Sequence, residues 1–195
     1  GWEQRQPATA YPGYSLDRHA FAVAADAEGQ AELWLEPDNL PSQQLAAYTI
    51  METDRLLEPP PFAQAVGARF EGVGTLEGYT LGQEVVRAGE TLPLTLVWRA
   101  AGTPPQPYTV FTHLLDASGR FIGGHDGPPA GGERPTTGWT AGEYIVDQHA
   151  LTLEETAYRG PARIEIGLYD PQTGQRVRLD NGADHLVLPA EIRVR

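Results

Sequence analysis

Apolar residues at every second position constrain this chain more than any other feature of its sequence. In "TLPLTLVW", residues 91–98, the side chains of Leu92, Leu94 and Leu96 fall on one face of an extended strand. The run "ARIEIGLY", residues 162–169, alternates in the same way. The 22 glycines and 17 prolines fall largely between such short runs, where they favour turns. The pattern predicts an all-β fold: an antiparallel β-sandwich of the immunoglobulin-like or jelly-roll-like kind.

Charge and composition exclude several classes of partner. The chain has 14 basic and 26 acidic residues, a net charge of −12, which disfavours nucleic acid and anionic lipid surfaces as partners. No apolar run approaches the roughly 20 residues of a membrane helix, so we expect no direct membrane insertion of this chain, which should itself be soluble. It lacks cysteine, which excludes disulfides and thiolate chemistry. Because the chain begins at Gly1 without an initiator methionine, we expect it to be a piece of a longer protein.

One motif occurs twice. The stretch "GYSLDRHAFAV", residues 13–23, returns as "EYIVDQHALTL", residues 143–153, and "GQAELWL" at 29–35 matches "GPARIEI" at 160–166. We interpret the N-terminal part as a half-repeat of the main module. The predicted domains are a β segment over 1–58 that resembles the back half of the module, a Pro-rich linker over 59–69 and a β-sandwich over 70–195.

The repeated motif places one Asp and one His on the apolar face of each strand. The two copies are Asp17 with His19 and Asp147 with His149. Residues two apart on a strand are separated by about 6.5–7 Å, so we expect no hydrogen bond within a pair. Each side chain should instead seek a partner on a neighbouring strand or loop, since an unpaired buried polar group is costly.

The candidate partners are His113 in "VFTHLLD" and Asp126 in "GGHDGPPAGG". Together with Asp147 and His149 they would form a network that fixes the Gly/Pro-rich loop to the sheet. A metal site made of these His and Asp residues is the alternative, but no close pair such as His-x-x-x-His supports it. We therefore predict a structural network, no metal and no cofactor.

Two tryptophans, Trp2 and Trp139, each follow a glycine in a segment before the Asp-His strand. A tryptophan in a loop can stack on a sugar or close the open end of a sandwich, and its repetition with the Asp and His favours closure. The stretch "GGHDGPPAGGERPTTGW", residues 123–139, is the longest irregular segment, and binding sites tend to lie on such loops.

Several segments carry a resemblance to a known family. These are "AGETLPLTLVWRA", "YTVFTHLLDASGR", "HDGPPAGG", "PTTGWTAGEYIVDQHALTL" and "GPARIEIGLYDPQTGQRV". In this order they resemble the β-domain appended to bacterial membrane glycosyltransferases of the protein-mannosyltransferase-like superfamily. The resemblance covers residues 70–179 and implies a sandwich on the extracytoplasmic side, after the membrane spans of the parent protein. The catalytic carboxylates of those transferases lie in membrane-domain loops, so it implies no catalytic residue here. The N-terminal half-repeat departs from that architecture.

The strand pattern is also similar, at the level of fold alone, to the glycan-recognising sandwich of some polysaccharide export ATPases. We therefore expect a non-catalytic accessory or binding module of a larger bacterial cell-envelope protein, whose partner is a glycan or another domain of that protein. The alternative is a carbohydrate-binding module that uses Trp2 or Trp139. A hydrolytic enzyme is the third hypothesis, although the chain has no Gly-x-Ser-x-Gly, phosphate loop or dinucleotide fingerprint.

Overall fold

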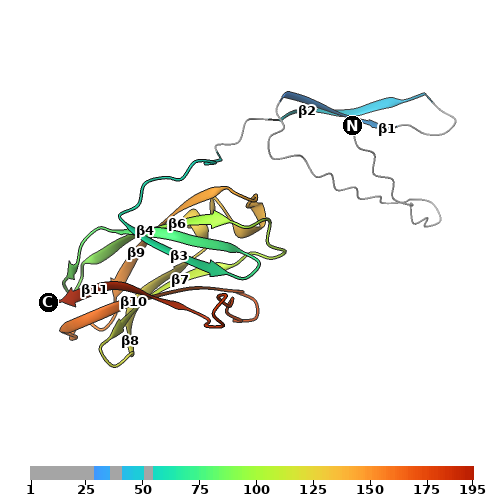
Figure 1. The fold of residues 1–195 in the computed structure, drawn as a ribbon. Coiled ribbons are helices and arrows are strands. Elements are labelled where there is room, and N and C mark those ends of the chain that lie inside the picture. The colour runs from blue at the N-terminus through green and yellow to red at the C-terminus, as the bar shows by residue number, and fades with distance from the viewer. Residues whose placement is uncertain (1–28, 36–40, 51–54) are drawn as a thin grey trace, which may run out of the picture. The chain divides into compact units, whose positions relative to one another are not determined.

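The computed structural model describes residues 29–35, 41–50 and 55–195, and the chain divides into two compact units, Gly1–Asp54 and Arg55–Arg195 (Figure 1). Among the described residues strands are the main elements, which confirms the predicted all-β fold. Within the described residues, neither short 3₁₀ helix is long or apolar enough to cross a membrane.

In the first unit, β1 (Gly29–Leu35) and β2 (Gln43–Ile50) form an antiparallel hairpin. The strands of the second unit are β3 (Gln64–Phe70), β4 (Gly74–Leu81), β5 (Val85–Val86), β6 (Thr91–Ala100), β7 (Thr109–Asp116), β8 (Phe121–Gly127), β9 (Tyr144–Leu153), β10 (Gly160–Tyr169) and β11 (Leu186–Val194). The 3₁₀ helices η1 (Pro129–Gly132) and η2 (Thr136–Gly138) lie between β8 and β9.

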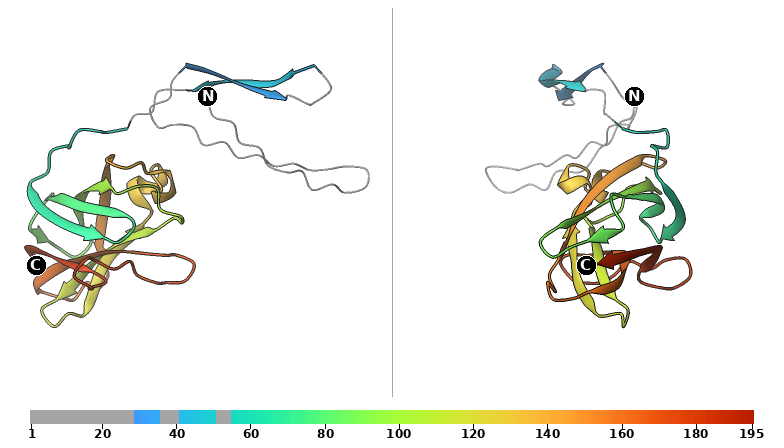
Figure 2. Two further views of the ribbon diagram at one scale, coloured as in Figure 1. Left: turned by 45° about the vertical axis from the view of Figure 1, so that its right-hand side comes forward. Right: turned by 90° about the vertical axis from the view of Figure 1, so that its left-hand side faces the viewer.

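The nine strands of the second unit follow the order β3-β4-β6-β9-β8-β7-β10-β11-β5. All neighbours are antiparallel except β11 and β5, which are parallel, so the sheet departs from the predicted purely antiparallel pattern in one short pair. Strands β8 and β9 pair over only two positions, so the sheet curls there and its two halves face each other (Figures 1 and 2). The result is a sandwich of a β3-β4-β6-β9 layer and a β8-β7-β10-β11 layer around one core.

The core contains the side chains that the alternation placed on inner faces. Leu92, Leu94, Leu96 and Trp98 of β6 are buried, as are Ile164, Ile166 and Leu168 of β10. Phe70 packs edge-on against Trp98 with their ring centroids 5.4 Å apart. Burial of these apolar side chains from both layers is the main term that holds the layers together.

The Asp-Ala-Ser-Gly segment, residues 116–119, forms the turn between β7 and β8. Oδ1 of Asp116 accepts hydrogen bonds from the backbone N–H and the hydroxyl of Ser118 and from the N–H of Arg120, at 2.9, 2.6 and 3.0 Å. These hydrogen bonds lower the pKa of Asp116 to about 2, and the bond from the Ser118 hydroxyl contributes most. Gly119 supplies the positive φ of 83° that closes the turn.

The second unit begins before the predicted boundary at residue 70. Strand β3 adds Gln64–Phe70 to the edge of the sheet, within the segment predicted as linker. Arg55 lies against buried Glu143 and donates to the carbonyl of Gly138 at 3.0 Å. The backbone of Leu56 accepts from Tyr144 at 2.7 Å. Residues from Arg55 onward are therefore part of the module, because they form hydrogen bonds and an ion pair with residues at and just before the start of β9.

The hairpin of the first unit shares the register of β10 and β11 over residues Gly29–Glu32. Strands β1 and β10 begin at the glycines that the sequence match aligns, Gly29 and Gly160, which pair with Ile50 and Val194 respectively. The ladder is irregular after Leu33 in β1 and around the aligned Ile164 in β10. The half-repeat itself stays a prediction.

Candidate functional site

Asp147 on β9 is the centre of a buried hydrogen-bond network. Its side chain is 0% exposed and faces the core between the layers. Oδ2 accepts from the indole N–H of Trp98 at 3.2 Å, and Oδ1 accepts from the backbone N–H of Ala130 in η1 at 2.9 Å. Trp98 lies on the neighbouring strand β6, and η1 belongs to the Gly/Pro-rich loop. Asp147 therefore fixes that loop to the sheet.

His149, two residues along β9, also bonds to this carboxylate. Its Nε2 lies 2.9 Å from Oδ2 of Asp147. The expectation that the pair would not bond directly is wrong, because both side chains lean along the strand and the imidazole ring spans the remaining gap. His149 is buried as well, so the contact satisfies two polar groups at once.

His125 on β8 extends this network to the surface. Its Nδ1 lies 2.9 Å from Nδ1 of His149, and the two rings meet edge to face with centroids 5.1 Å apart. When His149 donates from Nε2 to Asp147, its Nδ1 accepts from the Nδ1–H of His125. Partial burial, followed by the neighbouring His149, lowers the pKa of His125. His125 was not among the predicted site residues, because the glycines around it indicated a loop, whereas they lie in β8.

His113 and Asp126 do not join the Asp147 network, contrary to the prediction. On β7 the core-facing residues are Thr112 and Leu114, so His113 lies on the outer face. Its Nε2 is 3.2 Å from Oδ1 of Asp126. The predicted four-residue network is therefore two separate clusters, one inside the sandwich and one on its outer face.

The outer cluster continues across β10. Nη1 of Arg176 donates to Oε1 of the mostly buried Glu165 at 3.0 Å, and its guanidinium lies 4.3 Å from the ring centroid of Phe111. Phe111 lies over Gly167, where a Cβ would overlap its ring. His113 Nδ1 is 3.6 Å from Oε2 of Glu165. These contacts cover the outer face with the protein's own side chains.

The side chain of Trp139 is 0% exposed and belongs to the hydrophobic core of the sandwich. Its ring centroid lies 6.5 Å from that of Trp98, and its indole N–H donates to the carbonyl of Arg134 at 2.8 Å. A ring buried on both faces cannot stack on a sugar, so the structure contradicts glycan contact by Trp139 and agrees with its role in closure. Trp2, Asp17 and His19 lie outside the described residues.

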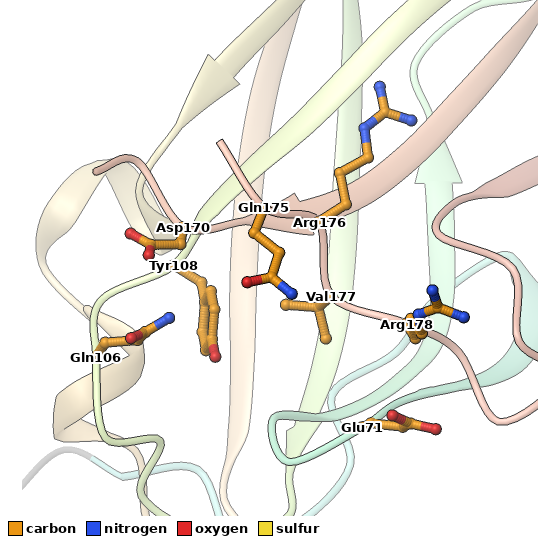
Figure 3. Close-up of a pocket in the computed structure, with 8 residues that line it drawn as sticks. All are labelled: Glu71, Gln106, Tyr108, Asp170, Gln175, Arg176, Val177 and Arg178. Atoms are coloured by element: carbon orange, nitrogen blue, oxygen red, sulfur yellow. The ribbon is translucent and has the colours of Figure 1, made fainter. Parts of the chain in front are cut away.

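Two open hollows lie on the second unit. One, of about 290 Å³, is lined by His113, Phe121, Gly124, His125, Asp126 and Glu154. The other, of about 250 Å³, is lined by Glu71, Gln106, Tyr108, Asp170, Gln175, Arg176, Val177 and Arg178 (Figure 3). We call the second one the Tyr108 hollow. No sequence pattern predicted this hollow, because its residues come from three separate connections between strands.

Over the part of the chain that the structure describes, no group of three or more His, Cys, Asp or Glu residues is arranged to hold a metal ion. The Asp147 carboxylate already lies within hydrogen-bond distance of three N–H groups, which leaves it poorly suited to a cation.

Comparison with known protein families finds no model that matches this chain, and comparison with curated proteins finds no match. The resemblance to the domains appended to glycosyltransferases therefore stays a prediction.

Proposed function

We propose that this chain is a non-catalytic binding or accessory module of a larger bacterial cell-envelope protein, displayed on the extracytoplasmic side. The observation that carries the proposal is the state of Asp147: a fully buried carboxylate whose oxygens accept from Trp98, Ala130 and His149. A general acid or base must reach a substrate proton at hydrogen-bond distance. Asp147 is instead used to hold a loop, and the repetition of its motif fits an architectural role.

A glycosyltransferase is the proposed parent, from the order of motifs between residues 70 and 179. The complete gene tests this part of the proposal. Membrane spans in the same reading frame would support an appended domain. A gene that encodes nothing beyond this chain would contradict it.

The non-catalytic character has its own test. The full chain would be incubated with a panel of bacterial surface oligosaccharides, and their anomeric proton signals followed by NMR over time. We expect no new reducing-end signals. Product formation that disappears in Asp147→Asn, with the variant shown to be folded by circular dichroism, would establish the rival hydrolase.

A further inference from the structure

We propose that the Tyr108 hollow binds one neutral pyranose unit of a glycan. The inference rests on the proposed binding function and adds to it a ligand class and a location. The proposed sugar site is therefore the Tyr108 hollow, whose side chains are accessible, and not Trp139, which is buried.

Three connections between strands build the hollow. Gln106 and Tyr108 precede β7, residues 170–178 follow β10, and Glu71 lies in the turn between β3 and β4. In Figure 3, the side chains of Tyr108 and Gln175 project into the middle of the hollow, and those of Glu71 and Arg178 project at one end of it. Loops gathered on a rigid sheet commonly carry binding sites.

The backbone on the Tyr108 side is held from inside the fold. The hydroxyl of Thr136, which is buried, accepts from the N–H of Tyr108 at 2.9 Å and donates to the carbonyl of Gln106 at 3.0 Å. Both residues are thereby fixed through their main chains, and their side chains remain available to a ligand. Such preorganisation lowers the entropic cost of binding.

The opposite wall is fixed in the same manner. The N–H of Asp170 donates to the carbonyl of Gln175 at 2.9 Å, and the N–H of Val177 donates to that of Leu168 at 2.8 Å. The N–H of Glu71 donates to the carbonyl of Arg178 at 2.8 Å, which connects this wall to the β3–β4 turn. Main-chain hydrogen bonds therefore join the β3–β4 turn to residues 170–178, whereas the Thr136 hydroxyl holds the connection that precedes β7.

The side chains that project from this frame have hydrogen-bonding capacity to spare. No hydrogen bond or ion pair to another described residue uses the side chains of Glu71, Gln106, Tyr108, Gln175 or Arg178. Arg176 differs, because its guanidinium turns away from the hollow toward Glu165 and Phe111 (Figure 3). The free groups are two amides, one phenol, one carboxylate and one guanidinium.

This set of groups fits a sugar. Each amide offers both donors and an acceptor, which suits the neighbouring hydroxyls of a pyranose, and the Tyr108 ring offers an apolar surface for its C–H groups. Among the side chains with spare hydrogen-bonding groups, the Glu71 carboxylate and the Arg178 guanidinium offset each other in charge, which favours a neutral over an anionic ligand. The volume of about 250 Å³ is below the roughly 300–1,000 Å³ of drug-sized pockets, so one ring is the expected occupant.

The test is ligand-observed NMR with the full chain and a panel of neutral methyl hexopyranosides, with glucuronic acid as the anionic comparison. We expect saturation transfer to at least one neutral glycoside, with a dissociation constant on the order of 1 mM. Tyr108→Phe and Gln175→Ala should each weaken binding by about tenfold, since each removes a hydrogen-bonding group. Gln172→Ala is the matched control, because Gln172 lies on the same connection but does not line the hollow.

Tyr108 also packs against the core, so the isosteric Tyr108→Phe and the exposed Gln175→Ala are preferred to truncation of the ring. Absence of transfer to every neutral glycoside, or binding of glucuronic acid alone, would overturn the inference. Binding that survives both variants unchanged would also overturn it, by placing the sugar elsewhere. None of these outcomes contradicts the non-catalytic module, whose tests are the absence of turnover and the gene.

Discussion

Oδ1 of Asp147 accepts the backbone N–H of Ala130 at 2.9 Å, and Ala130 has a φ of 52°. Within the described residues, Ala130 is the only non-glycine residue with positive φ. A left-handed conformation costs an L-residue roughly 1–2 kcal/mol, so the loop holds an unfavourable backbone against a buried carboxylate. The contact joins the Gly/Pro-rich loop to a fully buried carboxylate.

Replacing Asp147 should test that contact. Asp147→Asn keeps the shape of the side chain but removes the charge and directs an amide N–H₂ toward groups that donate. We expect the free energy of unfolding to fall by about 2–4 kcal/mol, measured by chemical denaturation. Asp180→Asn, at an exposed aspartate, is the control and should change it by less than about 0.5 kcal/mol. Equal effects of the two substitutions would refute the anchoring role.

At Ala130 we expect one substitution to stabilise the protein, in contrast to the loss of stability expected for Asp147→Asn. Ala130→Gly should raise the free energy of unfolding by up to about 1 kcal/mol, because glycine adopts positive φ without the steric penalty. Ala130→Val should lower it, since a β-branched residue is disfavoured there. Thermal unfolding of the three proteins at one pH would show the order Gly, Ala, Val; a destabilising glycine would argue against strain at this position.

Because the pKa of His125 is lowered in the folded chain, we expect the free energy of unfolding to fall on mild acidification. Partial burial and the adjacent His149 lower its pKa, while Asp126 and Asp147 act in the opposite direction. Because the folded-state pKa is below the unfolded value of about 6.5, the unfolded chain takes up the proton first as pH falls. The stabilisation from neutral His125 is therefore present above about pH 6.5 and declines below it.

The measurement is the free energy of unfolding at pH 8 and pH 5 for the parent chain and for His125→Asn. The variant should lose less stability between the two pH values than the parent. If the parent chain and His125→Asn lost the same stability between pH 8 and pH 5, His125 would not be the cause of the pH dependence.

The strand pairs β1–β2 and β10–β11 should differ in how much they contribute to the stability of the second unit. Ile192 of β11 is 0% exposed, whereas Tyr48, which occupies the matching position in β2, is 59% exposed. Ile192→Ser should lower the free energy of unfolding of the second unit by about 3 kcal/mol or more. Tyr48→Ser should leave its unfolding transition unchanged within about 0.5 kcal/mol. A comparable loss in both variants would show that the first hairpin stabilises the second unit.

The sequence by itself determined the fold class and the local elements. Alternation at Leu92, Leu94 and Leu96 predicts a strand with one buried face, and the Asp116–Gly119 turn follows from the hydrogen bonds of an aspartate to its own neighbours. These features need only residues close in the chain, so a single sequence is enough to infer them. The inward placement of Asp147 and His149 followed from the same period of two.

The tertiary structure alone decided what each of these side chains meets. Trp98 and His125 reach Asp147 and His149 from other strands, His113 falls on the outer face, and Trp139 is enclosed. The Tyr108 hollow combines residues from 71 to 178. Such contacts depend on how the sheet curls and which strands become neighbours, and burial in the core, not local spacing, sets that arrangement.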